Sequence, residues 1–334
     1  MIMKSQIRIK RYTLIALMAT LLSCNGFAQK GTPTITKTFE LNQPGTLNSQ
    51  SSGGGIVVEG TDQNKVVVQA FVRKNGKILS PTDPSLADVL KDFNLDIQKN
   101  GSVITANVER KRNFKFWNNV GISLKIIVPK EMSCNIASSG GGLKISDVDG
   151  THDLASSGGG IRIENVTGTT KASSSGGGVQ AINQNGDARL SSSGGGVTLD
   201  EGHGNVYARS SGGGVRLKNV HGDVDASSSG GGVTVTGETG AIRATSSGGS
   251  VHVNISNLSK KLYLASSGGG VDATIQNGDK LGMDLDLKSD RVYIDLQNFS
   301  GTSEKDRVKG TMNGGGIPVY MHASGGNVNV KFQD

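Results

Sequence analysis

The densest chemical cluster in the sequence is a run of interleaved cations and aromatic rings, ERKRNFKFWNN from Glu109. Such a run is suited to binding envelope glycans, lipid headgroups or surface proteins, because the charges attract anions and the rings offer a stacking surface. The candidate binding residues are Arg110, Lys111, Arg112, Phe114, Lys115, Phe116 and Trp117. The alternative is a hairpin loop whose aromatic side chains fold back onto the protein.

A second candidate site is a pair of histidines, His203 and His221, which are spaced by 18 in the sequence. If the chain repeats with that period, imidazoles on neighbouring repeats could hold one Zn²⁺ together with Asp223 or Glu201. The alternative is two exposed turn residues. We predict no cofactor, and this pair is the one metal site that the sequence suggests.

Catalysis is not predicted, so no catalytic residue is assigned. The glycine triplets of the chain are followed by aliphatic strand patterns, whereas a phosphate-binding loop needs a lysine and a following helix. A polysaccharide-cleaving β-helix would need carboxylates converging with arginine or lysine on one face. The two rows predicted to point outward are mixed in type: Lys144, Arg162, Gln180, Thr198, Arg216, Thr234, His252 and Asp272 in one, and Asp153, Lys171, Arg189, Tyr207, Asp225 and Arg243 in the other.

Residues 1–28 are typical of a secretory signal peptide, with basic residues before a short apolar segment, Leu14–Leu22, and small residues before Gln29. We therefore predict an exported protein of the periplasm, the cell surface or the surrounding medium. The competing interpretation is lipid attachment at Cys24, within the sequence LLSC. No later segment is apolar for long enough to span a membrane.

The signal segment also changes the charge and the cysteine content. It holds four Lys or Arg and no acidic residue, so its removal lowers the formal net charge from +7 to +3. The basic composition is therefore no argument for nucleic-acid binding, and no nucleic-acid partner is predicted. After removal Cys134 is the remaining cysteine, and we expect it to be buried.

The organisation of the chain is set by a repeated Ser-Ser-Gly-Gly motif. From Ser138 onward its starts are at Ser138, Ser156, Ser174, Ser192, Ser210, Ser228, Ser246 and Ser266, so the interval there is 18, except for a last interval of 20. A flexible linker has no such register, and fixed periodicity is the signature of a solenoid.

Each repeat predicts two short strands and a third side rich in serine and glycine. An aliphatic pair spaced by two, such as Val215 and Leu217, follows each glycine triplet. Counting on in steps of two places Val224, Ala226, Ser228 and Gly230 inside, with the serine hydroxyls bonded to nearby backbone groups. At the bend after the first strand we expect a stacked ladder formed by Asp147, Asn165, Asn183, Glu201 and Asn219.

The fold class predicted is all-β, a parallel β-helix with 18-residue coils and β-rich caps at both ends. A right-handed path is favoured because parallel strands joined through one sheet adopt it. We predict a signal peptide over 1–28, a β-rich region over 29–136 continuous with the solenoid, regular repeats over 137–270, and C-terminal coils with a cap over 271–334. One helix is expected in the first region, with Asp83 as N-cap and Pro84 as its first residue.

Three runs resemble a known family: IIVPKEMSCNIASSGGGLKI from Ile126, TLNSQSSGGGIVVEG, and TMNGGGIPVYMHASGGNVNVKF near the C-terminus. They resemble the bacterial putative-adhesin domains of unknown function, over nearly all of residues 31–334. The resemblance implies a β-helix with glycine-bearing coils and a strand ending in Val-Pro just before the repeats. It implies no catalytic motif.

These observations predict a non-enzymatic exported β-solenoid, serving as an adhesion or scaffolding module of the bacterial cell envelope. The alternative is a β-helical carbohydrate-active protein that binds or cleaves polysaccharide. An acidic or arginine-rich cleft crossing several coils would favour the alternative, and smooth mixed faces would favour the module.

Overall fold

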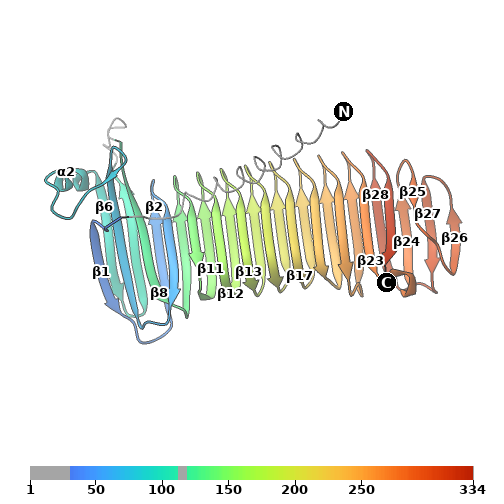
Figure 1. Cartoon of the computed structure of the whole chain (residues 1–334), viewed down its shortest axis with the longest axis horizontal. Coiled ribbons are helices and arrows are strands. Elements are labelled where there is room, and N and C mark those ends of the chain that lie inside the picture. Colours follow the sequence, from blue (N-terminus) through green and yellow to red (C-terminus); the bar gives the residue numbers. More distant parts are fainter. Residues whose placement is uncertain (1–30, 112–118, 334) are drawn as a thin grey trace, which may run out of the picture.

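The computed structural model describes residues 31–111 and 119–333. Within them the chain is all-β, as predicted, apart from helix α2 (Leu86–Lys91) and a 3₁₀ turn, η1 (Gly278–Lys280). Long, mostly parallel ladders of strands run along an elongated molecule (Figure 1). No helix among these residues has the length and apolar character needed to cross a membrane.

The central strands form two ladders in which each residue lies beside its equivalent in the next repeat. In the first ladder Ile161 lies opposite Val179, and in the second Val206 lies opposite Val224. The first ladder contains β10 (Leu143–Ser146), the start of β12 (Ile161–Ser174), β13 (Val179–Asn185), β15 (Val197–His203), β17 (Val215–His221), β19 (Val233–Glu238), β21 (Val251–Ser256) and β23 (Val271–Gln276). The second contains β9 (Met132–Ser138), β11 (Asp149–Ser156), the end of β12, β14 (Ala188–Ser192), β16 (Val206–Ser210), β18 (Val224–Ser228), β20 (Ala241–Ser246) and β22 (Lys261–Ser266).

The bend after each first-ladder strand carries the predicted polar column. Asp147, Asn165, Asn183, Glu201 and Asn219 all have positive φ, between 51° and 60°. Asparagine and aspartate tolerate this left-handed backbone better than other side chains do. The amide of Asn165 donates to Asp147 Oδ1 at 2.9 Å, and the amide of Asn183 donates to Asn165 Oδ1 at 3.1 Å. The stacked ladder is therefore confirmed at these rungs.

The core is a continuous stack of small aliphatic side chains between the two ladders. Val215, Leu217, Val224 and Ala226 are buried, and the first serine of each Ser-Ser pair is buried with them. Each of these serines bonds backbone groups, as predicted. The expectation for Gly230 was wrong, because β18 ends at Ser228 and the alternation ends with it, leaving Gly230 exposed.

Cys134 lies within the same core, on β9, and burial raises the pKa of its thiol to about 12. The thiolate, which is the reactive form, is therefore scarce at neutral pH. This agrees with the expectation of a buried cysteine.

At the N-terminal end, antiparallel strands flank the first repeat-like segment. Strands β2 and β3 pair in parallel with β9 and β10, so that Ser51 lies opposite Ser138. On their other side they pair with β7 and β8, beyond which the pairing becomes antiparallel. The strands of this end are β1 (Ile35–Glu40), β2 (Gly45–Ser51), β3 (Ile56–Thr61), β4 (Lys65–Lys74), β5 (Lys77–Ile78), β6 (Phe93–Asn100), β7 (Val103–Arg110) and β8 (Val120–Pro129).

At the C-terminal end the chain passes the end of the ladders and then returns. Strands β28 and β29, the last in sequence, lie between β22 and β23 on one side and β24 and β25 on the other (Figure 1). Strand β27 pairs antiparallel with β24 and with β26. The strands are β24 (Met283–Lys288), β25 (Val292–Tyr293), β26 (Phe299–Ser303), β27 (Arg307–Met312), β28 (Ile317–Ala323) and β29 (Val328–Gln333).

The predicted helix exists but begins later than expected. Its N-cap is Ser85. Asp83 Oδ1 accepts hydrogen bonds from the backbone N–H and from the hydroxyl of Ser85. These bonds close a turn before the helix, in the way that aspartate side chains commonly do. Asp83 therefore precedes the N-cap, and Pro84 lies outside the helix.

A buried histidine in the core predicts a pH dependence of stability. His152 is 1% exposed, and burial lowers the pKa of its imidazole below the ordinary 6.5. The unfolded chain then binds more protons, so the free energy of unfolding should fall as the pH drops below about 6.5. We expect the melting temperature to decline between pH 7 and pH 5, and to decline less in His152→Leu. A His152→Leu protein with an unchanged slope of melting temperature against pH would contradict this assignment.

Candidate functional site

The cation–aromatic run from Arg110 to Trp117 lies only partly within the described residues. Arg112, Phe114, Lys115, Phe116 and Trp117 fall outside them. Arg110, at the end of β7, donates from Nη2 to the carbonyl oxygen of Val120 at 3.3 Å and lies over Gly53, where a Cβ atom would come within 2.8 Å of it. The backbone N–H of Lys111 donates to the carbonyl oxygen of Asp92. The described part of the run is thus tied to neighbouring segments, and its role in binding stays a prediction.

The two histidines lie on neighbouring strands, as their spacing predicted. The ring centroids of His203 and His221 are 4.7 Å apart, and both side chains are exposed. Among residues 31–111 and 119–333, no group of three or more His, Cys, Asp or Glu is arranged to hold a metal ion. The two imidazoles are thus neighbours without a third such ligand among the described residues, and a role of this pair in zinc binding stays a prediction.

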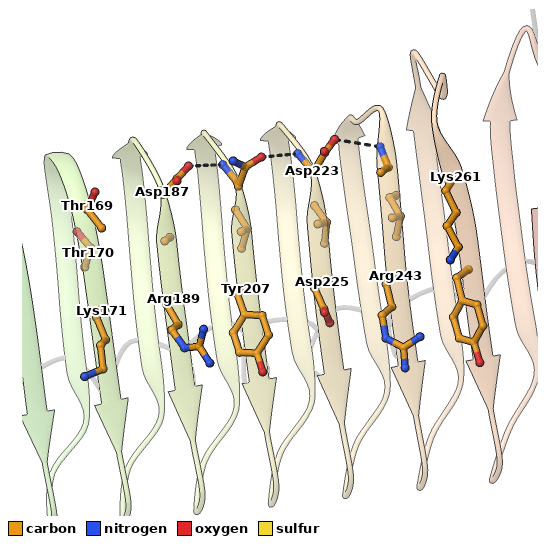
Figure 2. A pocket seen from close by; sticks show the side chains of 17 residues that line it. Thr169, Thr170, Lys171, Asp187, Arg189, Tyr207, Asp223, Asp225, Arg243 and Lys261 are labelled. Atoms are coloured by element: carbon orange, nitrogen blue, oxygen red, sulfur yellow. Dashed lines mark hydrogen bonds between the residues drawn. The ribbon is translucent and has the colours of Figure 1, made fainter. Parts of the chain in front are cut away.

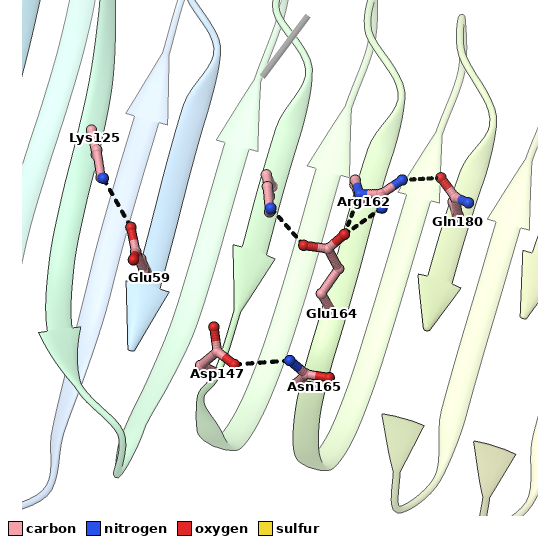
Figure 3. A network of polar contacts seen from close by, with 8 residues as sticks. Glu59, Lys125, Asp147, Arg162, Glu164, Asn165 and Gln180 are labelled. Carbon is pink, nitrogen blue, oxygen red and sulfur yellow. Dashed lines mark hydrogen bonds and ion pairs between the residues drawn. The ribbon is translucent and has the colours of Figure 1, made fainter. Parts of the chain in front are cut away.

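The outward row of the first ladder is mixed, as predicted, and the charges at its β10–β12 end are paired with one another. Glu164 accepts from Lys144 and Arg162, and Arg162 also donates to Gln180 (Figure 3). Burial alone would raise the pKa of the Glu164 carboxyl, but the hydrogen bonds from Lys144 and Arg162 outweigh it and lower that pKa. Further along, His252 lies 2.9 Å from Asp272. The charges of Lys144, Arg162 and Glu164 are therefore engaged within the protein, whereas Arg216 of the same row has no acidic partner among the described residues.

The outward row of the second ladder is different, because aromatic rings hold its cations. The guanidinium carbon of Arg189 lies 4.1 Å from the ring centroid of Tyr207, and that of Arg209 lies 4.4 Å from the same centroid. Arg243 lies 4.5 Å from the centroid of Tyr263. The row continues at the C-terminal end, where Tyr320 stacks on Tyr263 with centroids 4.7 Å apart. We call this the tyrosine–arginine row, formed by Lys171, Arg189, Tyr207, Asp225, Arg243, Tyr263 and Tyr320.

A second row runs beside it, at the positions where the same strands begin. Asp187 Oδ1 accepts from the backbone N–H of Asn205 at 2.9 Å, Asn205 Oδ1 accepts from that of Asp223 at 3.3 Å, and Asp223 Oδ1 accepts from that of Ala241 at 3.2 Å. Each side chain is thereby fixed to the next repeat. We call this the strand-start row.

Between the two rows lies an open groove of about 540 Å³ (Figure 2). Its floor is formed at the buried positions Ala188, Val206, Val224 and Ile242, whose side chains belong to the core. The groove crosses the strands from β12 to β22. It is therefore a channel along the molecule, suited in shape to an extended chain.

Three cations that line this groove, and Arg209 beside its Tyr207, lack an acidic partner. Within the part of the chain that the structure describes, no carboxylate forms an ion pair or hydrogen bond with Arg189, Arg209, Arg243 or Lys261. In contrast, Lys171 pairs with Asp153 at 3.1 Å, and Asp223 pairs with Lys260 at 2.8 Å. The guanidinium groups of the tyrosine–arginine row therefore keep their N–H donors free for an anion.

The sequence contains the signal for this groove, but two features hide it. Tyr207 and Arg243 stand in the outward row that the period predicts, whereas the one longer interval between repeats displaces Tyr263 by two positions. Tyr320 joins the row from a strand much later in the chain. Tyrosine is rare here, with five in the chain, so three in one row is the observation that could have identified the surface.

The chain is similar to several solved structures at low sequence identity. One is a putative adhesin from Bacteroides fragilis, with 11% identity, coverage of 89% of this chain and 96% of that chain, and a TM-score of 0.38. Another is a putative adhesin from Parabacteroides merdae, with 11% identity, coverage of 89% and 95%, and a TM-score of 0.39. A third is a putative lipid binding protein from Parabacteroides distasonis, with 14% identity, coverage of 90% and 97%, and a TM-score of 0.29.

No protein-family model matches the sequence, and no curated protein matches it. Two of these three solved structures are described as putative adhesins and the third as a putative lipid binding protein. Their descriptions include the putative-adhesin name of the family that the sequence resembles.

Proposed function

We propose that the protein is a non-enzymatic exported module of the bacterial cell envelope, acting in adhesion or scaffolding. In this proposal residues 1–28 are a signal peptide, and residues 29–136, 137–270 and 271–334 form one right-handed β-solenoid with 18-residue coils and a cap at each end. The periplasm, the cell surface and the medium are its proposed locations, with lipid attachment at Cys24 as the alternative means of retention.

The observation that carries the proposal is a set of arginines at the groove that are held by tyrosine rings and have no acidic partner. Glu164 pairs with Lys144 and Arg162 on the first ladder, whereas Arg189, Arg209 and Arg243 have only aromatic rings as partners. An exposed cation without an acidic partner adds little to folding, since even a paired surface charge contributes only about 0–1 kcal/mol. Rows of such cations beside a groove are suited to contact with another molecule.

The proposal is tested by cosedimentation of the exported protein with washed envelope fragments from bacteria. We expect it in the pellet, and we expect release at high salt, because surface charges are screened over about 8 Å at physiological ionic strength. Recovery of the protein in the supernatant at all salt concentrations would overturn the proposed function.

A carbohydrate-active protein is the second candidate function, and one observation favours its binding form. The groove crosses several strands and carries Arg189 and Arg243 beside Asp225, which is the arginine-bearing cleft expected of this class. The cleaving form is tested by incubating the protein with polysaccharides and measuring newly released reducing ends. Their release would replace the non-enzymatic proposal.

A further inference from the structure

We propose that the groove binds an extended acidic polysaccharide, whose carboxylates pair with Arg189 and Arg243 in the groove and with Arg209 beside it. This inference rests on the proposed function and adds the class of ligand. Three properties of the groove support this inference. They are the free guanidinium groups, the spacing of the strands, and a floor whose backbone hydrogen bonds are made to the neighbouring strands.

The free guanidinium groups determine the charge of the ligand. A guanidinium group presents a planar set of N–H donors that matches a carboxylate in two-point contact. Tyr207 lies against both Arg189 and Arg209, so it limits the orientations that these two side chains adopt. Tyr207 is thus a positioning residue, since it acts through the arginines.

The spacing of the strands determines the shape of the ligand. Successive side chains in the row stand on neighbouring strands, about 4.8 Å apart, which is close to the length of one sugar unit in an extended polysaccharide. A chain of pyranose units lying along the groove therefore presents one unit to each strand, from Arg189 past Tyr207 and Asp225 to Arg243 (Figure 2).

The floor argues against a peptide that would add to the sheet. The strands below the groove pair with neighbours on both sides, as β16 does with β14 and β18. Their backbone N–H and C=O groups are used within the ladder, so an extended peptide could not bind by adding a strand. Recognition must come from side chains, which is how sugars with hydroxyl and carboxylate groups are held.

The acidic residues of the groove argue against a nucleic acid. Asp225 lies in the same row as the arginines, and Asp187 lies in the strand-start row. A nucleic-acid strand carries one phosphate charge about every 3.4 Å and would meet these carboxylates with repulsion. A polysaccharide with hydroxyl groups between its carboxylates can instead donate hydrogen bonds to them.

The experiment measures binding of polygalacturonate and of alginate to the full exported chain, with neutral dextran as the reference polymer. In the test variant Arg189, Arg209 and Arg243 are each replaced by Gln. In the control variant Arg216, Lys218 and Lys331 are replaced by Gln, which removes the same charge from exposed positions of the first ladder. Thermal unfolding of each variant verifies that it is folded.

We expect at least one of the acidic polymers to bind, dextran not to bind, and the test variant to lose about ten-fold or more in affinity while the control loses less than three-fold. Tyr207→Leu should weaken binding with no change in the slope of log affinity against log salt, because no charge is removed, and Tyr207→Phe should retain wild-type binding. Absence of binding to both acidic polymers, or equal losses in the test and control variants, would overturn the proposal.

Two further polymers distinguish other ligands. Equal or tighter binding of polyglutamate or of single-stranded DNA would assign the groove to an acidic peptide or to a nucleic acid and would overturn the polysaccharide. If the protein sediments with envelope fragments but neither acidic polysaccharide binds, the ligand class is wrong while the proposed function stands. If the protein neither sediments with envelope fragments nor binds an acidic polysaccharide, the proposed function and the proposed ligand class are both wrong.

Discussion

Gly213→Ala should lower the free energy of unfolding by about 3 kcal/mol or more, although it adds a single methyl group. Gly213 is the middle glycine of its triplet, and a Cβ atom there would lie 2.5 Å from the backbone nitrogen of Gly196 in the neighbouring repeat. The backbone of Gly213 does not have a left-handed φ. The requirement for glycine is therefore the close approach of two backbones, which cannot relax as a flexible side chain would.

The matched control is Gly121→Ala, where the new Cβ would meet no atom within 4 Å and φ is likewise not left-handed. Its effect should stay within about 0.5 kcal/mol of zero. Urea-induced unfolding followed by circular dichroism measures both variants. Equal stability of the two variants would mean that the backbones of neighbouring glycine triplets leave room for a methyl group. The close approach of these backbones would then be contradicted.

Ser210→Ala should cost about 2–4 kcal/mol, because it leaves two partly buried backbone groups without a partner. The hydroxyl of Ser210 donates to the carbonyl oxygen of Gly195 at 2.8 Å and accepts from the N–H of Gly213 at 3.0 Å. Both partners belong to the glycine side of the repeat, one of them in the neighbouring repeat. The serine thus links successive repeats where the glycines supply no side chains.

The same two bonds recur at the equivalent serines, Ser156, Ser174, Ser192, Ser228, Ser246 and Ser266. Ser211→Ala is the control, because Ser211 is exposed and its replacement should change the free energy of unfolding by less than about 0.5 kcal/mol. The two variants differ by one position in the chain and by the face to which the hydroxyl points. A Ser210→Ala protein as stable as Ser211→Ala would show that these bonds contribute nothing net.

The regular part of this fold is predictable because its sequence repeats. The interval of 18 and aliphatic pairs such as Val215 and Leu217 identify the strands and the side of each that faces the core. The polar column at Asn165 and the buried serines follow from the same count. The prediction fails at Gly230, since the alternation holds only while the chain remains a strand.

The ends are less predictable because their pairings join distant residues. Val271 pairs with Val328, far along the chain, and the last strands are inserted between earlier ones. Strand β25 is short, because its pairing with β29 ends at Tyr293 although Ile294 and Leu296 still pack on the core. The groove is hidden in the sequence for the same reason: Tyr263 and Tyr320 enter its outer row through an irregular interval and a distant strand.

A crystal structure of the protein soaked with an oligogalacturonate would locate the ligand directly. We expect the oligosaccharide in the groove from β12 to β22, lying across the strands, with carboxylates against Arg189 and Arg243. An oligosaccharide bound to the first ladder near Arg216 or along the Ser-Gly side, with the groove empty, would contradict the assignment of the groove.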